Sequence, residues 1–201
     1  MTHRSLRCLL SAAFLLLFLA STAGASGEGD LTDFDRQVRT TAETCRKEVI
    51  HEFEILLSAK RLNATQLFDT FYIPVPDTAP QKFTTQYDKV VDQTIRAILD
   101  RYLVSDSRLL FVVAVDKNGY VPSHNSRYSK PLTDDQDYNA KNNRAKRMFN
   151  DRTGLAAARN TEPYLRQKYS RDTGEELFDM SVPIEVEGKH WGAIRIGYTQ
   201  Q

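Results

Sequence analysis

Two stretches near the end of the chain alternate apolar with polar residues, and this period of two constrains the fold more than any other feature. The alternation runs over 175–185 and 189–198, with the turn sequence Glu187-Gly188 between them. A two-residue turn would put the two apolar rows on opposite faces, whereas a three-residue loop would align them. We therefore expect an antiparallel hairpin with the loop 186–188, in which Gly188 takes the left-handed conformation.

The expected register divides this hairpin into an apolar face and a mixed face. The apolar face carries Phe178, Met180, Val182, Ile184, His190, Ile194, Ile196 and Tyr198. The mixed face carries Leu177, Asp179, Ser181, Trp191, Ala193 and Arg195. Asp179 then lies directly opposite Arg195, where unlike charges attract.

Earlier in the chain, apolar residues recur at steps of three and four, which predicts helices over 34–60 and 83–104. The first stripe includes Cys45, the only cysteine left after the N-terminal leader described below, and we expect its thiol to be buried. The same stripe would suit a partner helix, so a homodimer through this face is a second expectation. Prolines between the two helices predict an extended connector over 72–81.

The remaining segments complete an α+β domain. An apolar run over 109–115, the turn 116–119 and residues 120–121 predict a hairpin, and a further strand is expected over 163–169. Together with the final hairpin these strands form a five-stranded antiparallel sheet over 109–198. The polar, basic stretch 123–160 is an expected helical insertion, with a short helix over 139–149 and an interruption at Gly154.

We expect the helices to cover the apolar face and the insertion to cover the mixed face, with a pocket between the insertion and the sheet. Arginine forks in the insertion suit the carboxylates of a small anionic ligand. On the expected short helix, Arg144 and Arg147 lie one turn apart and point to the mixed face. The candidate ligand-binding residues are His124, Arg127, Tyr128, Arg144, Arg147, Asp179, Trp191 and Arg195.

The N-terminus is typical of a secretory signal peptide over residues 1–25. Arg4 and Arg7 precede an apolar run, and Ala23-Gly24-Ala25 offers a small-residue cleavage site. No later apolar run has the length of a membrane span, so we expect export to the periplasm as a freestanding domain, 26–201. The alternative is that the run stays as a membrane anchor. N-terminal sequencing would decide between them.

Charge and motifs exclude several classes of function. The 27 basic and 26 acidic residues nearly balance, and loss of Arg4 and Arg7 leaves a net charge near −1, which predicts no nucleic-acid partner. Hydrolase and metal-binding motifs are missing from the sequence, so we expect no enzyme activity, no metal and no cofactor. Two alternatives stay open: a haem- or redox-linked sensor using His124 or His190, and an exported enzyme whose loose candidate residues are Asp151, Arg152 and His124.

Several stretches resemble the extracytoplasmic Cache (PAS-like) sensory domains of bacterial methyl-accepting chemotaxis proteins. They are Phe68–Pro74, Val112–Tyr120, Phe149–Ala157, and Val182–Ile184 with Trp191–Arg195. The resemblance implies long N-terminal helices beside a PAS-like sheet, a dimer, and a ligand held between the sheet and its covering loops. The expected function is a freestanding periplasmic ligand-binding module that signals, in chemotaxis or another sensory pathway, through a membrane receptor or sensor kinase partner.

Overall fold

The computed structural model describes residues 31–170, 174 and 176–200. The expected signal peptide, 1–25, lies outside the described residues. Within them, no helix combines the length and the apolar character needed to cross a bilayer.

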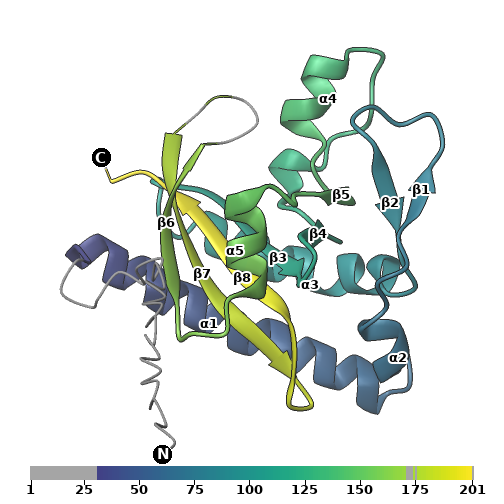
Figure 1. The fold of residues 1–201 in the computed structure, drawn as a ribbon, viewed down its shortest axis with the longest axis horizontal. Coiled ribbons are helices and arrows are strands. Elements are labelled where there is room, and N and C mark those ends of the chain that lie inside the picture. Colours follow the sequence, from purple (N-terminus) through teal and green to yellow (C-terminus); the bar gives the residue numbers. More distant parts are fainter. Residues whose placement is uncertain (1–30, 171–173, 175, 201) are drawn as a thin grey trace, which may run out of the picture.

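The central sheet has four antiparallel strands in the order β3-β8-β7-β6 (Figure 1). They are β3 (Leu109–Asp116), β6 (Leu165–Ser170), β7 (Glu176–Val186) and β8 (Lys189–Tyr198). The expected fifth strand, β4 (Tyr120–Val121), pairs instead with β5 (Arg147–Met148). Pro122 follows β4 and has no N–H to donate. The pairing of this segment with β3 is therefore limited to one bridge, between Ser123 and Ala114.

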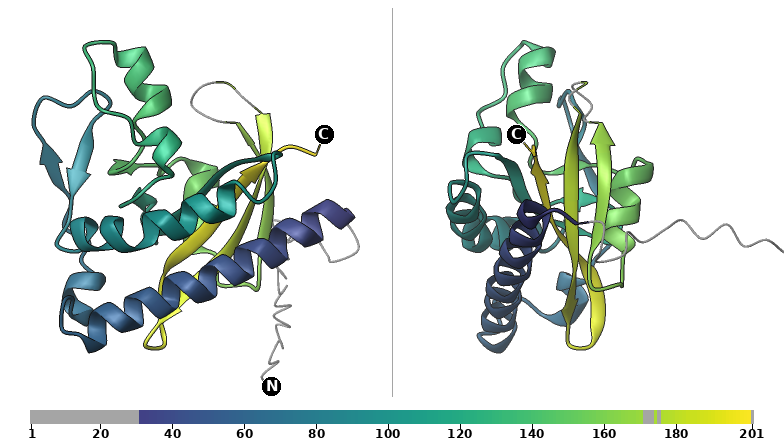
Figure 2. Two further views of the ribbon diagram at one scale, coloured as in Figure 1. Left: turned by 180° about the vertical axis from the view of Figure 1, so that it is seen from behind. Right: turned by 90° about the vertical axis from the view of Figure 1, so that its left-hand side faces the viewer.

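Two long helices, α1 (Asp33–Ser58) and α3 (Asp88–Leu103), lie across one face of the sheet (Figure 2). They bury the predicted stripes against the apolar rows of β7 and β8, and the α+β class is confirmed. Cys45 is fully buried within this layer, and burial raises the pKa of its thiol.

The second helix begins five residues later than predicted, because residues 82–84 form a strand. This strand, β2 (Lys82–Thr84), pairs with β1 (Ile73–Val75) in a small hairpin, after the short helix α2 (Ala64–Leu67). The proline-rich connector is therefore an extended hairpin. Its second strand joins the next sheet, since the N–H of Phe83 donates to the carbonyl of Lys146 at 2.8 Å.

The opposite face of the sheet is covered by α5 (Arg152–Arg159), while η2 (Ser126–Tyr128) and α4 (Gln136–Asn142) lie beyond β3 (Figures 1 and 2). The expected helix over 139–149 was wrong, because α4 ends at Asn142 and Arg147 belongs to β5. Gly154 does not interrupt a helix but lies inside α5. Any Cβ there would lie 2.3 Å from the carbonyl oxygen of Phe149, so the close approach requires glycine.

The final hairpin reaches the predicted alignment of apolar rows by a different route. Val186 pairs with Lys189, so the turn has two residues, and both Glu187 and Gly188 have positive φ, as type I′ turns require. A bulge at Trp191 then supplies the extra residue that brings the apolar rows back to one face. The left-handed Gly188 was therefore predicted correctly, and the three-residue loop was wrong.

The bulge also changes which residues face each other. Trp191 turns to the helices and His190 turns to α5, the reverse of the expected placement. Asp179 lies opposite Gly197 rather than opposite Arg195, which pairs with Ser181. Because the shift is an even number of residues, Asp179 and Arg195 still share the mixed face.

A buried carboxylate, Asp35, joins the first turn of α1 to the end of β8. It accepts hydrogen bonds from the backbone and hydroxyl of Thr32 at 2.9 Å, from the hydroxyl of Tyr198, and from Gln200 at 3.2 Å. Nε of Arg166 lies 3.0 Å from Oδ1. Burial by itself would raise the pKa of Asp35, but the hydrogen bonds outweigh it and the pKa falls below its ordinary value of 3.8.

We expect this carboxylate to make the fold sensitive to acid. A carboxyl whose pKa is lowered by folding contributes stability above its unfolded pKa, and this contribution is lost as the pH falls through the folded value, here below 3.8. Asp35→Asn should lower the free energy of unfolding by about 2 kcal/mol at neutral pH and flatten its pH dependence below about pH 4. Urea unfolding at a series of pH values measures both.

The matched control is Asp33→Asn in the same turn of α1, where the side chain is 99% exposed. Exposed ion pairs contribute little, so this change should cost less than about 1 kcal/mol. Equal losses in the two variants would contradict the role assigned to Asp35.

Candidate functional site

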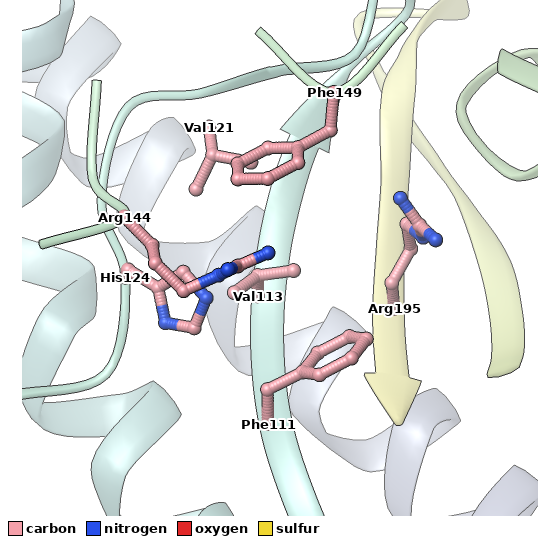
Figure 3. A pocket seen from close by; sticks show the side chains of 7 residues that line it. All are labelled: Phe111, Val113, Val121, His124, Arg144, Phe149 and Arg195. Atoms are coloured by element: carbon pink, nitrogen blue, oxygen red, sulfur yellow. The ribbon is translucent and has the colours of Figure 1, made fainter. Parts of the chain in front are cut away.

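A small cavity lies between the mixed face of the sheet and the segment 120–149, which we call the cover segment. The sheet supplies Phe111, Val113 and Arg195, and the cover segment supplies Val121, His124, Arg144 and Phe149 (Figure 3). The cavity measures about 20 Å³, room for one or two water molecules. Its wall is apolar and its polar groups are basic, a composition typical of sites for small anionic ligands.

Phe111 and Val113 project into the cavity because they alternate with core residues along β3. Val112 and Ala114 point to the helices, whereas Val113 pairs with Arg195 on the mixed face. Gly197 makes room for the ring of Phe111, since a Cβ at Gly197 would lie 2.2 Å from that ring. The glycine therefore lets the aromatic wall lie flat on β8.

Arg195 and Asp179 form a buried ion pair on the sheet side of the cavity. Nη2 of Arg195 lies 3.1 Å from Oδ2 of Asp179, and their side chains are 3% and 0% exposed. Burial raises the pKa of the Asp179 carboxyl, and Arg195 opposes this shift by favouring the ionised form. The pair fixes the guanidinium at the edge of the cavity.

His124 lies at the cavity with its ring held by its own backbone and by two aromatic rings. The N–H of Asn125 donates to Nδ1 at 2.8 Å, so the proton of the neutral ring resides on Nε2. The ring centre lies 4.9 Å from that of Tyr128 and 6.3 Å from that of Phe111. The imidazole therefore has a defined tautomer and orientation.

Arg144 and Arg147 meet at Phe149, although no helix holds them. Each guanidinium carbon lies 4.9 Å from the centre of the Phe149 ring, and each donates to the carbonyl of Ala140 at 3.0 Å. Arg144 is 3% exposed, and its guanidinium extends into the cavity (Figure 3). A buried guanidinium stacked on an aromatic ring is well placed to grip a planar anion.

Comparison with solved structures identifies the fold. The sensory domain of the Campylobacter jejuni chemoreceptor Tlp3 with isoleucine bound matches with a TM-score of 0.50 and 15% identity, over 83% of this chain and 52% of that chain. The chain thus spans about half the length of that domain. This chain has the fold of an extracytoplasmic, PAS-like Cache sensory domain.

Two further solved structures are similar to this chain. The Tlp3 ligand-binding domain in complex with L-valine has a TM-score of 0.48 and 13% identity, over 83% of this chain and 53% of its own. The E. coli DcuS sensor domain has a TM-score of 0.39 and 19% identity, over 78% and 92%. No family model matches the sequence, and no curated protein matches it either.

The Cache-type fold brings together some of the eight candidate residues and separates others. Three of them line the cavity: His124, Arg144 and Arg195. Three others contact residues of its wall: Tyr128 packs on His124, Arg147 stacks on Phe149, and Asp179 pairs with Arg195. Arg127 is exposed outside the cavity, with its guanidinium over the ring of Tyr128. Trp191 lies on the far face of the sheet, where its indole N–H donates to the carbonyl of Leu67 at 3.0 Å.

Sequence reasoning missed the apolar walls Phe111, Val113, Val121 and Phe149. The signal for the two residues on β3 is a period of two, but it is hidden because both faces of that strand are buried and the run reads as uniformly apolar. Val121 and Phe149 lie on the two strands of the small sheet, whose pairing only the tertiary structure shows.

Tyrosine hydroxyls tie the cover segment to the helical layer through Tyr120, and hold the end of β3 through Tyr72 and Tyr87. The hydroxyl of Tyr120 donates to Asp88 at 2.9 Å, and those of Tyr72 and Tyr87 donate to Asp116 at 2.6 and 2.8 Å. Burial is the main cause that raises the pKa of all three phenols. Their protons therefore stay in place at any physiological pH.

A lysine ties the cover segment to β2. Lys82 donates to the side chain of Asn143 and to the carbonyl of Ala145. Its pKa falls to about 8, first because the amine is partly buried and then because Arg147 and Lys146 repel its charge.

The geometry gives the haem and enzyme alternatives no support. Nε2 of His190 is 2.8 Å from the carbonyl oxygen of Ala158, and His124 lies in a cavity far smaller than a macrocycle. Asp151 caps α5 by accepting hydrogen bonds from the backbone N–H groups of Thr153 and Gly154. Among the described residues, no group of three His, Cys, Asp or Glu side chains is arranged to hold a metal ion.

Proposed function

We propose that this chain is a periplasmic sensory module, a single domain over 26–201, that binds a small anionic or polar ligand in the cavity. Its output would pass to a membrane receptor or sensor kinase partner. The observation that carries the proposal is the buried guanidinium of Arg144, which extends into an apolar cavity beside His124 and Arg195. The Cache-type fold agrees with this reading, because the solved chemoreceptor domain with that fold holds isoleucine.

Ligand entry requires the cover segment to move, since about 20 Å³ holds no organic ligand. This movement would be transmitted to α3, because the cover segment contacts that helix at two residues. Asp88 accepts a hydrogen bond from Tyr120, and Asp100 accepts one from the N–H of Ser126 at 2.8 Å. A ligand that binds the opened form shifts the population toward it. The homodimer through α1 stays a prediction.

A thermal-shift screen against carboxylates, amino acids, amines and sugars tests the proposal. A ligand at 100 times its Kd adds about 2.7 kcal/mol of stability, which is readily seen as a rise in Tm. For any ligand found, Arg144→Met should weaken binding about 10- to 100-fold, because hydrogen bonds between charged groups contribute about 1.5–3 kcal/mol. Isothermal titration measures the change.

Arg144→Lys keeps the charge but not the planar fork, so its affinity should lie between those of the wild type and Arg144→Met. Arg127→Met, which removes an exposed arginine outside the cavity, is the matched control and should leave affinity unchanged. A ligand whose affinity is the same in Arg144→Met and the wild type would show that the site lies elsewhere.

A further inference from the structure

We propose that Lys146 is a strained joint in the cover segment. Its left-handed backbone favours opening of the segment, and its contacts with three other elements hold the segment closed. The inference rests on the proposed function for its purpose, because opening admits a ligand. It goes further by naming the residue at which the cover segment opens and the helix, α3, to which that residue is coupled.

The backbone of Lys146 lies in the left-handed region, with a φ of 62°. A side chain with a Cβ is crowded there, and lysine has neither the freedom of glycine nor a short polar side chain that bonds its own backbone. Such a conformation persists only where the surrounding structure imposes it. Lys146 lies between Arg144 in the cavity wall and Arg147 at the start of β5, so a change of φ there would redirect the wall relative to β5.

The setting of Lys146 differs from that of the other non-glycine residues with positive φ. Lys60, Asp77 and Glu187 are exposed residues of surface turns. The side chain of Lys146 is only 31% exposed, and its turn is bonded to neighbouring segments on both sides. The strain at Lys146 therefore acts on the packing of the cover segment, whereas strain at an exposed turn acts on the turn alone.

Three contacts from distant parts of the chain hold Lys146 in place. Its N–H donates to the carbonyl of Val121 on β4 at 2.7 Å, and its carbonyl accepts from the N–H of Phe83 on β2 at 2.8 Å. Its Nζ lies 3.5 Å from Oδ2 of Asp88 on α3. Loss of one of these contacts would let the backbone of Lys146 relax toward a negative φ.

Asp88 couples this turn to the beginning of α3. Its side chain is 2% exposed, and it also accepts from the hydroxyl of Tyr120 at 2.9 Å and from the N–H of Thr85 at 3.3 Å. One carboxylate thus joins β4, the start of α3 and the ammonium of Lys146. Because a buried carboxylate depends strongly on the cation beside it, displacement of Lys146 would disturb the first turn of α3.

Hydrogen exchange of the ligand-free protein, followed by NMR, tests the joint. The reporters are the amides of Phe83 and Arg144, which donate to the carbonyls of Lys146 and Tyr128. Lys146→Ala and Lys146→Gly both remove the ion pair, and only alanine keeps a strained Cβ. We expect reporter protection to be about 3- to 10-fold lower in the alanine variant, because left-handed backbone disfavours alanine. Equal protection in the two variants would overturn the joint.

Lys60 supplies the matched control, because it has a φ of 54° and is exposed after the end of α1. Lys60→Ala and Lys60→Gly should give equal protection at the two reporter amides. A difference as large as that between the Lys146 variants would mean that the reporters exchange through global unfolding, which would also overturn the joint.

A double-variant cycle tests the coupling to α3 at the Arg144 amide. Lys146→Met keeps the apolar stem and the strained backbone but loses the ammonium, and Asp88→Asn removes the charge of its partner. Each should lower protection about 3- to 10-fold, and both together should lower it little more than one alone, as expected for partners in one interaction. Effects that multiply in full would overturn the coupling.

The Asp88→Asn background also decides the case in which Lys146→Ala does not fold. There the ion pair is already absent, so adding Lys146→Gly changes only the backbone strain and the side chain beyond it. We expect this addition to raise the protection of the Arg144 amide. Unchanged or lower protection would overturn the joint.

The failure of this inference can be told apart from the failure of the proposed function, because the exchange experiments use no ligand. Equal protection in Lys146→Ala and Lys146→Gly would overturn the joint alone. If no compound in the broad screen binds in a manner that Arg144→Met weakens, the proposed function is overturned instead.

Discussion

Asp179→Ala is expected to lower the free energy of unfolding by about 3–5 kcal/mol, the range for breaking a buried ion pair from one side. Asp179 is fully buried, and its partner Arg195 is 3% exposed. Without the carboxylate, a guanidinium stays in the low-dielectric interior with its main counter-charge removed. Urea unfolding followed by circular dichroism measures the loss directly.

A double variant separates the effect of the unpaired charge from the effect of lost packing. Asp179→Leu combined with Arg195→Met removes both charges and should regain most of the stability lost in Asp179→Ala, because apolar replacement of a whole buried pair is often neutral. Asp33→Ala, at an exposed ion pair on α1, should cost less than about 1 kcal/mol. If Asp179→Ala were equally mild, Arg195 would not depend on Asp179.

Trp191→Ala is expected to cost a similar amount, about 3–5 kcal/mol, as large-to-small changes of aromatic core residues do. The indole is 2% exposed, and its centre lies 5.0 Å from the ring of Phe53 and 6.0 Å from that of Tyr87. Its removal leaves a cavity between the sheet and the helices. It also leaves the carbonyl of Leu67 without its hydrogen bond from the indole.

The same variant tests on which face the bulge places this residue. In the structure Trp191 packs in the helical core, whereas the register predicted from the sequence puts it at the ligand pocket. Trp191→Ala should therefore destabilise the fold but leave ligand affinity nearly unchanged, when titrated at a temperature at which the variant is folded. His190→Ala, which changes the neighbouring residue on the opposite face of the sheet, is the variant with which Trp191→Ala is compared. Loss of ligand affinity with little loss of stability in Trp191→Ala would contradict the observed register.

The helical layer was largely predictable because its signal is local. The stripe of α1 repeats every three to four residues, so Val38, Phe53 and Leu56 identify their buried face without knowledge of any partner. The hairpin β1-β2 escaped prediction for the opposite reason, since strands of three residues carry too little periodicity. Its pairing with the cover segment depends on contacts 63 residues apart in sequence, from Phe83 to Lys146.

The sequence predicted the charged residues of the candidate site better than the apolar residues that line its cavity. Arg144 and Arg195 were recognised because basic residues in an apolar setting are conspicuous in a sequence, yet the helix expected to carry Arg144 ends two residues before it, at Asn142. Phe111 was missed because an apolar residue in an apolar strand looks the same whether it faces the core or a cavity.

The sequence by itself determined the α+β class and the helical stripes, because each follows from a local period, whereas Asp179 and Arg195 share a face only because the bulge at Trp191 compensates for the two-residue turn. The tertiary structure alone decided which side of the sheet Trp191 and His190 occupy. A bulge of one residue shifts the pairing of the strand by one position, and such a shift moves each side chain to the other face of the sheet. The tertiary structure also decided that Arg144 meets Arg195 across an apolar cavity. The two lie 51 positions apart in the chain, and the cavity exists only where the cover segment packs on the sheet.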